Sequence, residues 1–250
     1  MTNEFILPHT HFHRCVISVE LSESFKAIFT EKWENGDDPV VAAIADTISQ
    51  VLDHSKDHLD QFFYRKLANL LLSATVECYL SSFLQAGGNN REGYRFDNDV
   101  HAAIRVSEDY TSLKDMFTKY EEDLKYGGLR GNPGSTKTPL EDVIEPIAAL
   151  QSVLQVGEFN FCEDAVKVLH EKYPGDGLEI VRCAITYRPE GSMRPAEKRA
   201  FERAAAEFCQ RLDNVKNVEK GLAPPVSVQE EATPAKQGFF SRVFGYGGKG

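Results

Sequence analysis

The segment from Leu59 to Leu84 constrains the fold more than any other part of the chain. Its apolar residues recur at close to helical spacing, and neither Gly nor Pro interrupts it before Gly87-Gly88. So long a helix with so broad an apolar stripe needs several partner helices to cover it. Because charged residues such as Arg65, Lys66 and Glu77 interrupt the stripe, we expect a buried central helix and not a membrane span. The apolar positions are Leu59, Phe62, Phe63, Leu67, Leu70, Leu71, Ala74, Tyr79, Leu80 and Phe83.

The rest of the chain shows the same helical periodicity. Apolar residues make up 42% of the 250 residues and charged residues 26%, which is enough to build a sizeable core. About seven or eight amphipathic segments follow one another with mostly short connections, and only Val16–Leu21 has the character of a strand. These features predict an all-α fold: an elongated, rod-like stack of antiparallel helices with a flexible C-terminal tail.

Local signals place several helix boundaries. Thr138 and Glu141 form a capping box, in which each side chain satisfies a backbone N–H at the start of a helix. We expect Asn160 and Asp176 to cap two further helices, and the remaining helices to cover residues 22–33, 38–54 and 194–217. On the helix that starts at Asp97, the residues expected to face the core are Val100, Ile104, Leu113, Met116, Phe117 and Tyr120.

The chain divides into three regions. Residues 1–21 are predicted to form an extended N-terminal arm, and residues 22–218 the helical bundle. From residue 219 onward the composition changes to Ala, Pro, Val, Glu and Lys without a period, which is typical of a linker. Residues 219–250 are therefore predicted to form a linker and an aromatic, basic tail.

Charge and cysteine usage exclude some classes of function. The formal net charge of −10 argues against a general nucleic-acid-binding protein. The five cysteines are scattered and never form a C-x-x-C pair, so we expect mostly buried free thiols. The opening residues lack the basic start and the long apolar stretch of a signal peptide. The cytoplasm is the expected compartment.

His9, His11, His13 and Cys15 alternate along the N-terminal arm. On an extended chain these side chains would project to one face, and three imidazoles with a thiolate suit zinc. The H-x-H spacing also occurs in metallohydrolase barrels, which need alternating strands and further ligands that this sequence lacks. A polar arm in which histidines cluster by chance is the simpler interpretation. We therefore predict no metal ligands and no cofactor.

No other set of residues predicts catalysis. His54 and His58 would share a helical face, but the spacing lacks the Glu of H-E-x-x-H and is more simply a helix end. The Gly-rich segments 87–90 and 126–136 match neither phosphate-binding motif, and the acidic run 121–123 is typical of a solvated helix end. No Ser/His/Asp or Cys/His set stands out. The sequence therefore predicts a protein that is not an enzyme.

The C-terminal tail carries the candidate contact residues. No acidic residue follows Glu231, and several aromatic residues lie close together near the end. An aromatic, basic mini-helix on a linker suits a membrane interface or a groove on a partner. The alternative is that the tail folds back onto the body. The residues expected to make membrane or partner contact are Phe239, Phe240, Arg242, Val243, Phe244 and Lys249.

Four passages resemble a known family. They are DPVVAAIADTISQVLDH (38–54), FFYRKLANLLLSATVECYLSSFLQ (62–85), FDNDVHAAIRVSEDYTSLKDMF (96–117) and TPLEDVIEPIAALQSVL (138–154). In this order they resemble the C-terminal helices of the Sec6 subunit of the exocyst, which is one of the rod-like helical tethering proteins. The resemblance covers residues 38–187, and neither the His-rich arm nor the aromatic tail is part of it.

The resemblance implies a non-enzymatic interaction module of exocytic vesicle tethering, located in the cytoplasm at the periphery of the plasma membrane or of vesicles. Its partners would be other subunits of the tethering complex and membrane-fusion proteins, with weak contact of the tail to anionic membranes. Family members are several times longer, so the chain would correspond to a last helical bundle or to a shortened relative. Two alternatives remain: a membrane-associated helical adaptor unrelated to the exocyst, and a metalloprotein built on His9, His11 and His13.

Overall fold

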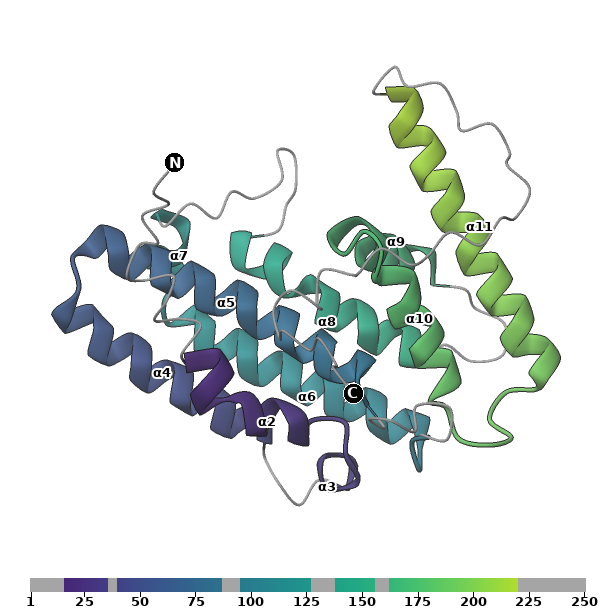
Figure 1. Cartoon of the computed structure of the whole chain (residues 1–250), viewed down its shortest axis with the longest axis horizontal. Coiled ribbons are helices and arrows are strands. Elements are labelled where there is room, and N and C mark those ends of the chain that lie inside the picture. The colour runs from purple at the N-terminus through teal and green to yellow at the C-terminus, as the bar shows by residue number, and fades with distance from the viewer. Residues whose placement is uncertain (1–15, 36–39, 87–94, 127–137, 156–161, 220–250) are drawn as a thin grey trace, which may run out of the picture.

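The computed structural model describes residues 16–35, 40–86, 95–126, 138–155 and 162–219, and every element in these ranges is helical (Figure 1). The all-α prediction is confirmed. The short elements are the π-helical turn η1 (Val16–Glu20), α2 (Ser22–Ala27), α3 (Glu31–Glu34) and α7 (Glu121–Tyr126). The longer helices are α4 (Val40–His58), α5 (Gln61–Leu84), α6 (Asp99–Thr118), α8 (Pro139–Gln155), α9 (Glu163–Lys172), α10 (Gly177–Thr186) and α11 (Pro195–Glu219).

The helices form one elongated stack. Helices α4, α5, α6 and α8 lie along the long axis of the molecule, and α9, α10 and α11 continue the stack at one end (Figure 1). Helix α5 contacts α4, α7, α8 and α10, with α2 and η1 also packed against it. Helix α11 crosses the end of the stack at a steep angle and packs on α9 and α10.

Helix α5 is the central helix that the apolar run predicts. Leu67, Leu71, Tyr79 and Phe83 on it are fully buried. Leu70, which the sequence pattern also places in the core, is only half-buried. The first turn of the helix differs more strongly from the prediction, because its aromatic residues are exposed to solvent.

By length and composition alone, α5 qualifies as a membrane span: an 18-residue window of it has a mean hydropathy of 1.4. Its charged residues therefore do not exclude a span, contrary to the prediction. Packing separates the two possibilities, because 67% of that window is buried by the rest of the described chain. Such burial is typical of the core helix of a bundle.

An aromatic cluster explains why the predicted helix over residues 22–33 is broken in two. Phe29 has a φ of +59°, a left-handed conformation that is unfavourable for a bulky residue. Helix α2 already ends at Ala27, because Ile28 is extended, and Phe29 follows in the turn. The ring of Phe29 lies 4.7 Å from the ring of Trp33 and 5.1 Å from that of Tyr79, centroid to centroid. All three side chains are buried, so the packing energy of the cluster offsets the backbone strain.

The capping signals are confirmed where they are strongest. The backbone N–H of Thr138 donates to Glu141 Oε2 at 3.0 Å, and the N–H of Glu141 donates to Thr138 Oγ1 at 3.2 Å. A further cap, which was not among the predicted ones, is Asp60 of α5, which accepts a hydrogen bond from the N–H of Phe62 at 2.9 Å. Asp176 occupies the N-cap position of α10 as predicted, but its side chain makes no capping hydrogen bond there.

Three sequence-based predictions are corrected. The possible strand at Val16–Leu21 is the turn η1, whose Val16 pairs through its carbonyl with the N–H of Leu21. Helix α9 begins at Glu163, so Asn160 is not its N-cap residue. Val100 and Ile104 of α6, which the apolar pattern predicts to face the core, are 63% and 46% exposed. Instead, α6 buries Ala102, Ala103, Val106, Leu113, Met116 and Phe117.

Candidate functional site

An apolar patch is exposed at the end of the stack where α4 turns into α5. Leu59, Phe62 and Phe63 are 38%, 58% and 38% exposed, and we call these three residues the end patch. The rings of Phe62 and Phe63 contact each other edge to face, with their centroids 5.5 Å apart. Exposed aromatic residues that cluster in this way are more typical of an interaction surface than of a random surface.

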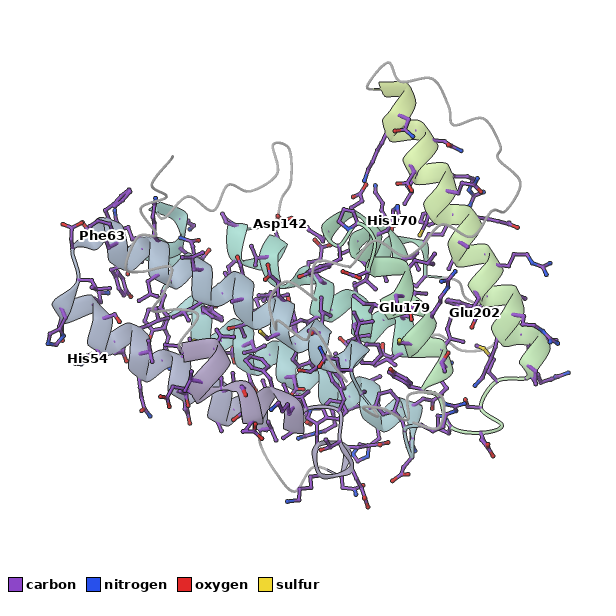
Figure 2. The ribbon with its side chains drawn as sticks, in the orientation of Figure 1. His54, Phe63, Asp142, His170, Glu179 and Glu202 are labelled. Carbon is purple, nitrogen blue, oxygen red and sulfur yellow. The ribbon has the colours of Figure 1, made fainter. Side chains whose placement is uncertain are left out.

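The end patch exists because of where α5 begins. Asp60 caps the helix, so Phe62 and Phe63 fall in its first turn. The apolar periodicity of α5 continues into this turn, but the helices that cover the rest of α5 leave it exposed. His54, in the last turns of α4, and Phe63 lie at the same end of the molecule (Figure 2).

Polar and basic groups border the end patch. The rings of His54 and His58 stack with centroids 4.2 Å apart, and Lys66 Nζ lies 4.6 Å from the centre of the Phe62 ring. Lys56 and Arg65 both face Asp123 of α7, at 3.3 and 3.6 Å. The border therefore carries charges of both signs. His54 and His58 lie in the last turns of α4, at a helix end as predicted.

A polar cluster beneath the end patch holds its two helices and α7 together. The Tyr120 hydroxyl donates to Asp53 Oδ1 at 2.8 Å and lies 2.9 Å from Ser49 Oγ. The amide of Asn69 donates to the carbonyl of Leu124 at 3.3 Å. These bonds connect α4, α5 and the segment around α7, so the end patch is presented on fixed elements and not on a loop.

A second surface feature is a groove of about 470 Å³ among α6, α8 and α9. Its volume lies within the roughly 300–1,000 Å³ that is usual for ligand sites. Lys114 Nζ lies 2.9 Å from Glu141 Oε1, so one of the carboxylates of the groove is already paired. The lining includes Tyr110 of α6, the small residues Ala148, Ala149 and Ala165, Val168, and the carboxylates of Glu141, Glu145 and Asp164. We call this feature the acidic groove.

A buried carboxylate lies at the centre of the bundle. The indole N–H of Trp33 and the hydroxyl of Tyr79 both donate to Asp109 Oδ2 at 2.8 Å, and Asp109 is 5% exposed. Burial raises the pKa of the Asp109 carboxyl to about 6, although the two hydrogen bonds oppose this shift. Through these two hydrogen bonds the carboxylate joins α3, α5 and α6.

Sequence reasoning missed Asp109, although a signal was present. Asp109 lies three residues after Val106 and four before Leu113, both of which are buried on α6. A carboxylate in register with core positions must be paired or protonated, since an isolated buried charge is very costly. Its partners could not be named, because Trp33 lies 76 positions away in the sequence.

The remaining predicted site residues are placed as follows. His9, His11, His13, Cys15 and all the tail residues lie outside the described residues. Among the described residues, no group of three or more His, Cys, Asp or Glu side chains is arranged to hold a metal ion. Cys78, Cys183 and Cys209 are buried free thiols and Cys162 is half-buried, as the sequence predicts. Burial raises the pKa of the Cys78 thiol to about 12, which makes it unreactive.

Taken together, the described residues form an all-helical stack, and its distinctive surface features are an exposed apolar end and an acidic groove. Comparison with protein families matches residues 8–189 to the family described as "Exocyst complex component Sec6". The chain belongs to this family, which confirms the resemblance found in the sequence. Comparisons with curated proteins and with solved structures gave no match.

The family match extends the resemblance and corrects one part of it. It begins at residue 8, so the His-rich arm lies inside the family region and not outside it. It ends at residue 189, so both α11 and the aromatic tail lie beyond it. The family consists of structural tethering subunits and is not a family of enzymes.

Proposed function

We propose that this protein is a non-enzymatic interaction module of exocytic vesicle tethering. The observation that carries the proposal is the Sec6 family match over residues 8–189. The helical stack supports it, because stacked helices offer long surfaces for side-by-side assembly with other helical proteins. The module would act in the cytoplasm at the periphery of the plasma membrane or of vesicles. Its partners would be other subunits of the tethering complex and membrane-fusion proteins.

We assign the first contact with another subunit to the end patch. Its three apolar side chains project from the first turn of α5 and the end of α4, and the helices beneath them are held by hydrogen bonds. An apolar stripe on a partner helix could cover such a surface with little change in either partner. Aromatic residues supply most of the binding energy in interfaces of this kind.

The double variant Phe62→Ser, Phe63→Ser should lose its tethering partners. Burial of one Phe side chain contributes about 1.5–3 kcal/mol, and each 1.4 kcal/mol is a factor of about ten in affinity. We therefore expect at least a roughly tenfold loss of exocyst subunits that co-purify with the chain from cells. Both residues are exposed, so the variant should melt at the same temperature as the wild type.

The matched control is Val215→Ser on α11, an exposed apolar position outside the family match. It should leave the recovered subunits unchanged. Equal recovery by wild type and double variant would remove the end patch from the proposed assembly. If the wild type itself recovers no exocyst subunit, the alternative of an unrelated helical adaptor is favoured.

A second contact is proposed for the tail, on the strength of its composition. Phe239, Phe240, Val243 and Phe244 are apolar, whereas Arg242 and Lys249 are basic and no acidic residue follows Glu231. Each basic residue near an anionic membrane contributes about 1 kcal/mol of binding free energy, and shallow insertion of the aromatic residues adds to this. The total is small, so binding would be weak. Weak contacts are sufficient in a tether that contains several membrane-binding subunits. Once one subunit is bound, the others are held at a high effective concentration near the membrane, so the overall affinity is much higher than that of one contact.

Liposome flotation tests the tail. The full chain should float with anionic liposomes, and both a chain that ends at Gln237 and the variant Phe240→Asp should float several-fold less. Flotation should also fall as salt is raised, because exposed charges are screened over about 8 Å at physiological ionic strength. Equal flotation of the three proteins, or flotation of none, would contradict a membrane role for the tail.

A further inference from the structure

One face of helix α5 is left partly open beyond the end patch. A row of residues that the neighbouring helices cover only in part starts at Phe63 and continues at alternating steps of four and three positions along α5. Leu67 and Leu71, on other faces of the helix, are fully buried. Because a helix advances about 1.5 Å per residue, the row spans about 21 Å. Its members, which we call the α5 stripe, are Phe63, Lys66, Leu70, Ser73 and Glu77.

The spacing of the α5 stripe fits packing against another helix. Its steps average about 3.5 residues, close to the roughly 3.6 residues of one helical turn, so the stripe keeps to one side of α5. Two helices pack side by side in this register when side chains of one fill the gaps between those of the other. Phe63 and Leu70 supply apolar surface, and the small side chains of Ser73 and its neighbour Ala74 leave space for larger groups.

Glu77 ends the stripe with a half-buried carboxylate. Within the described ranges, no residue forms a hydrogen bond or an ion pair with it. Burial raises the pKa of this carboxyl to about 7. Cys78 and Tyr173, whose own pKa values the Glu77 charge helps to raise, are uncharged at neutral pH. A half-buried charge without a partner destabilises the folded chain, and a basic group from another molecule would offset that cost.

Lys66 places the opposite charge near the end patch. Its Nζ lies 4.6 Å from the centre of the Phe62 ring, and no carboxylate of the described residues pairs with it. Lys66 precedes Glu77 by 11 positions, which is about three turns of helix. The stripe is therefore positive near one end and negative at the other. A partner helix that carries an acidic and a basic residue about three turns apart complements it in charge.

We propose that the α5 stripe is the binding site of an amphipathic helix from another subunit of the tethering complex. Apolar residues of that helix pack on Phe63 and Leu70, and one of its Lys or Arg residues pairs with Glu77. This binding mode rests on the proposed function above, and it extends the contact at the end patch into an interface along the length of a helix.

Recovery of exocyst subunits by full-length variants tests the role of Glu77. Glu77→Lys should reduce recovery from cells at least about tenfold, because it brings like charges face to face, and Glu77→Gln should reduce it about three- to tenfold. Glu77→Gln should melt at the wild-type temperature or above it, because it removes an unpaired half-buried charge from the free chain. Wild-type recovery by either variant overturns the proposed pairing. So does a Glu77→Gln variant that melts below the wild type, since that result indicates a structural role.

Glu207→Lys is the matched control for Glu77→Lys. Glu207 is exposed on α11, outside the family match, and the substitution makes the same change in net charge. Recovery and melting temperature should both stay at the wild-type values. A loss of recovery as large as that of Glu77→Lys would show an effect of net charge alone and would overturn the assignment to the stripe.

Photo-crosslinking in cells identifies what lies on the stripe. One full-length chain carries p-benzoylphenylalanine in place of Ser73, on the stripe, and a second carries it in place of Phe62, in the end patch. Mass spectrometry maps the crosslinked peptides. The Ser73 position should capture a helical segment of an exocyst subunit, with a Lys or Arg about one turn from the crosslinked residue.

The two positions separate this proposal from the proposed function. If the Phe62 position captures an exocyst subunit and the Ser73 position captures none, or a segment that is not helical, the helix site is wrong and the proposed function stands. If the Ser73 position captures a helix of a protein outside the tethering complex, the stripe binds a helix but the proposed function is wrong. Capture of no protein at either position overturns both.

Discussion

Replacing Leu71 with Ala should lower the free energy of unfolding by about 2–5 kcal/mol. Leu71 is fully buried at the middle of α5, so its loss removes apolar contacts and leaves a cavity among helices that relax only in part. Urea denaturation followed by circular dichroism measures the change. Because total stabilities are typically 5–15 kcal/mol, the variant is expected to unfold at a clearly lower urea concentration.

Leu59→Ala is the matched control for Leu71→Ala. It removes the same atoms from the same apolar run, but Leu59 is 38% exposed at the end patch. Its effect should be a small fraction of that at Leu71. A loss below about 0.5 kcal/mol at Leu71 would be typical of a surface position and would contradict its place in the core.

The second large effect is expected at Asp109. In Asp109→Ala, the indole N–H of Trp33 and the hydroxyl of Tyr79 lose their common acceptor and remain buried. Each buried donor left without a partner costs about 1–3 kcal/mol, so the loss of both partners should lower the free energy of unfolding by roughly 2–6 kcal/mol. Asp109→Asn should be much milder, because the amide oxygen can accept both hydrogen bonds.

The same pair of variants predicts a pH dependence. Burial raises the pKa of Asp109 to about 6 in the folded protein, whereas an unfolded Asp titrates near 3.9. Between these values the folded state binds more protons than the unfolded state, so stability falls as pH rises from about 4 to about 7. The loss attributable to this group is on the order of 2–3 kcal/mol.

Asp109→Asn should remove this part of the slope, since the amide does not titrate. Thermal unfolding between pH 4 and pH 7 of the wild type and of Asp109→Asn measures the difference. Glu77, whose pKa burial raises to about 7, contributes a slope of the same sign that is present in both proteins. Identical pH profiles would show that Asp109 does not have a raised pKa in the fold.

Local chemistry made the helices predictable. The capping box at Thr138 and Glu141 joins residues only three positions apart, so the sequence alone contains both partners. Helical periodicity likewise identified α5 and α11, because apolar residues that recur at helical spacing over so long a segment predict an amphipathic helix. The break at Phe29 was not predictable, since its left-handed conformation is stabilised only by packing against Trp33 and Tyr79.

The candidate sites depended on tertiary structure. Periodicity shows that a helix has an apolar face, but not how far its neighbours extend along it, so Phe62 and Phe63 were expected to be covered and are exposed. For the same reason Val100 and Ile104 were assigned to the core, whereas the first turns of α6 bury Ala102, Ala103 and Val106 instead; the predicted Leu113, Met116, Phe117 and Tyr120 are buried. The acidic groove is formed by three helices together, and no single segment contains its pattern.

The sequence by itself determined three properties of this chain: its all-helical class, the approximate bounds of most helices, and its family. The first two depend on short-range periodicity and capping, and the third depends on the order of motifs along the chain. The tertiary structure decided which apolar residues remain exposed at the end patch, which carboxylates line the groove and which donors surround Asp109. These features depend on contacts between residues far apart in the chain, such as Trp33 and Asp109 at a separation of 76 positions. Such contacts are set by the packing of whole helices, and the packing energy of a whole bundle cannot be read from any one of its segments.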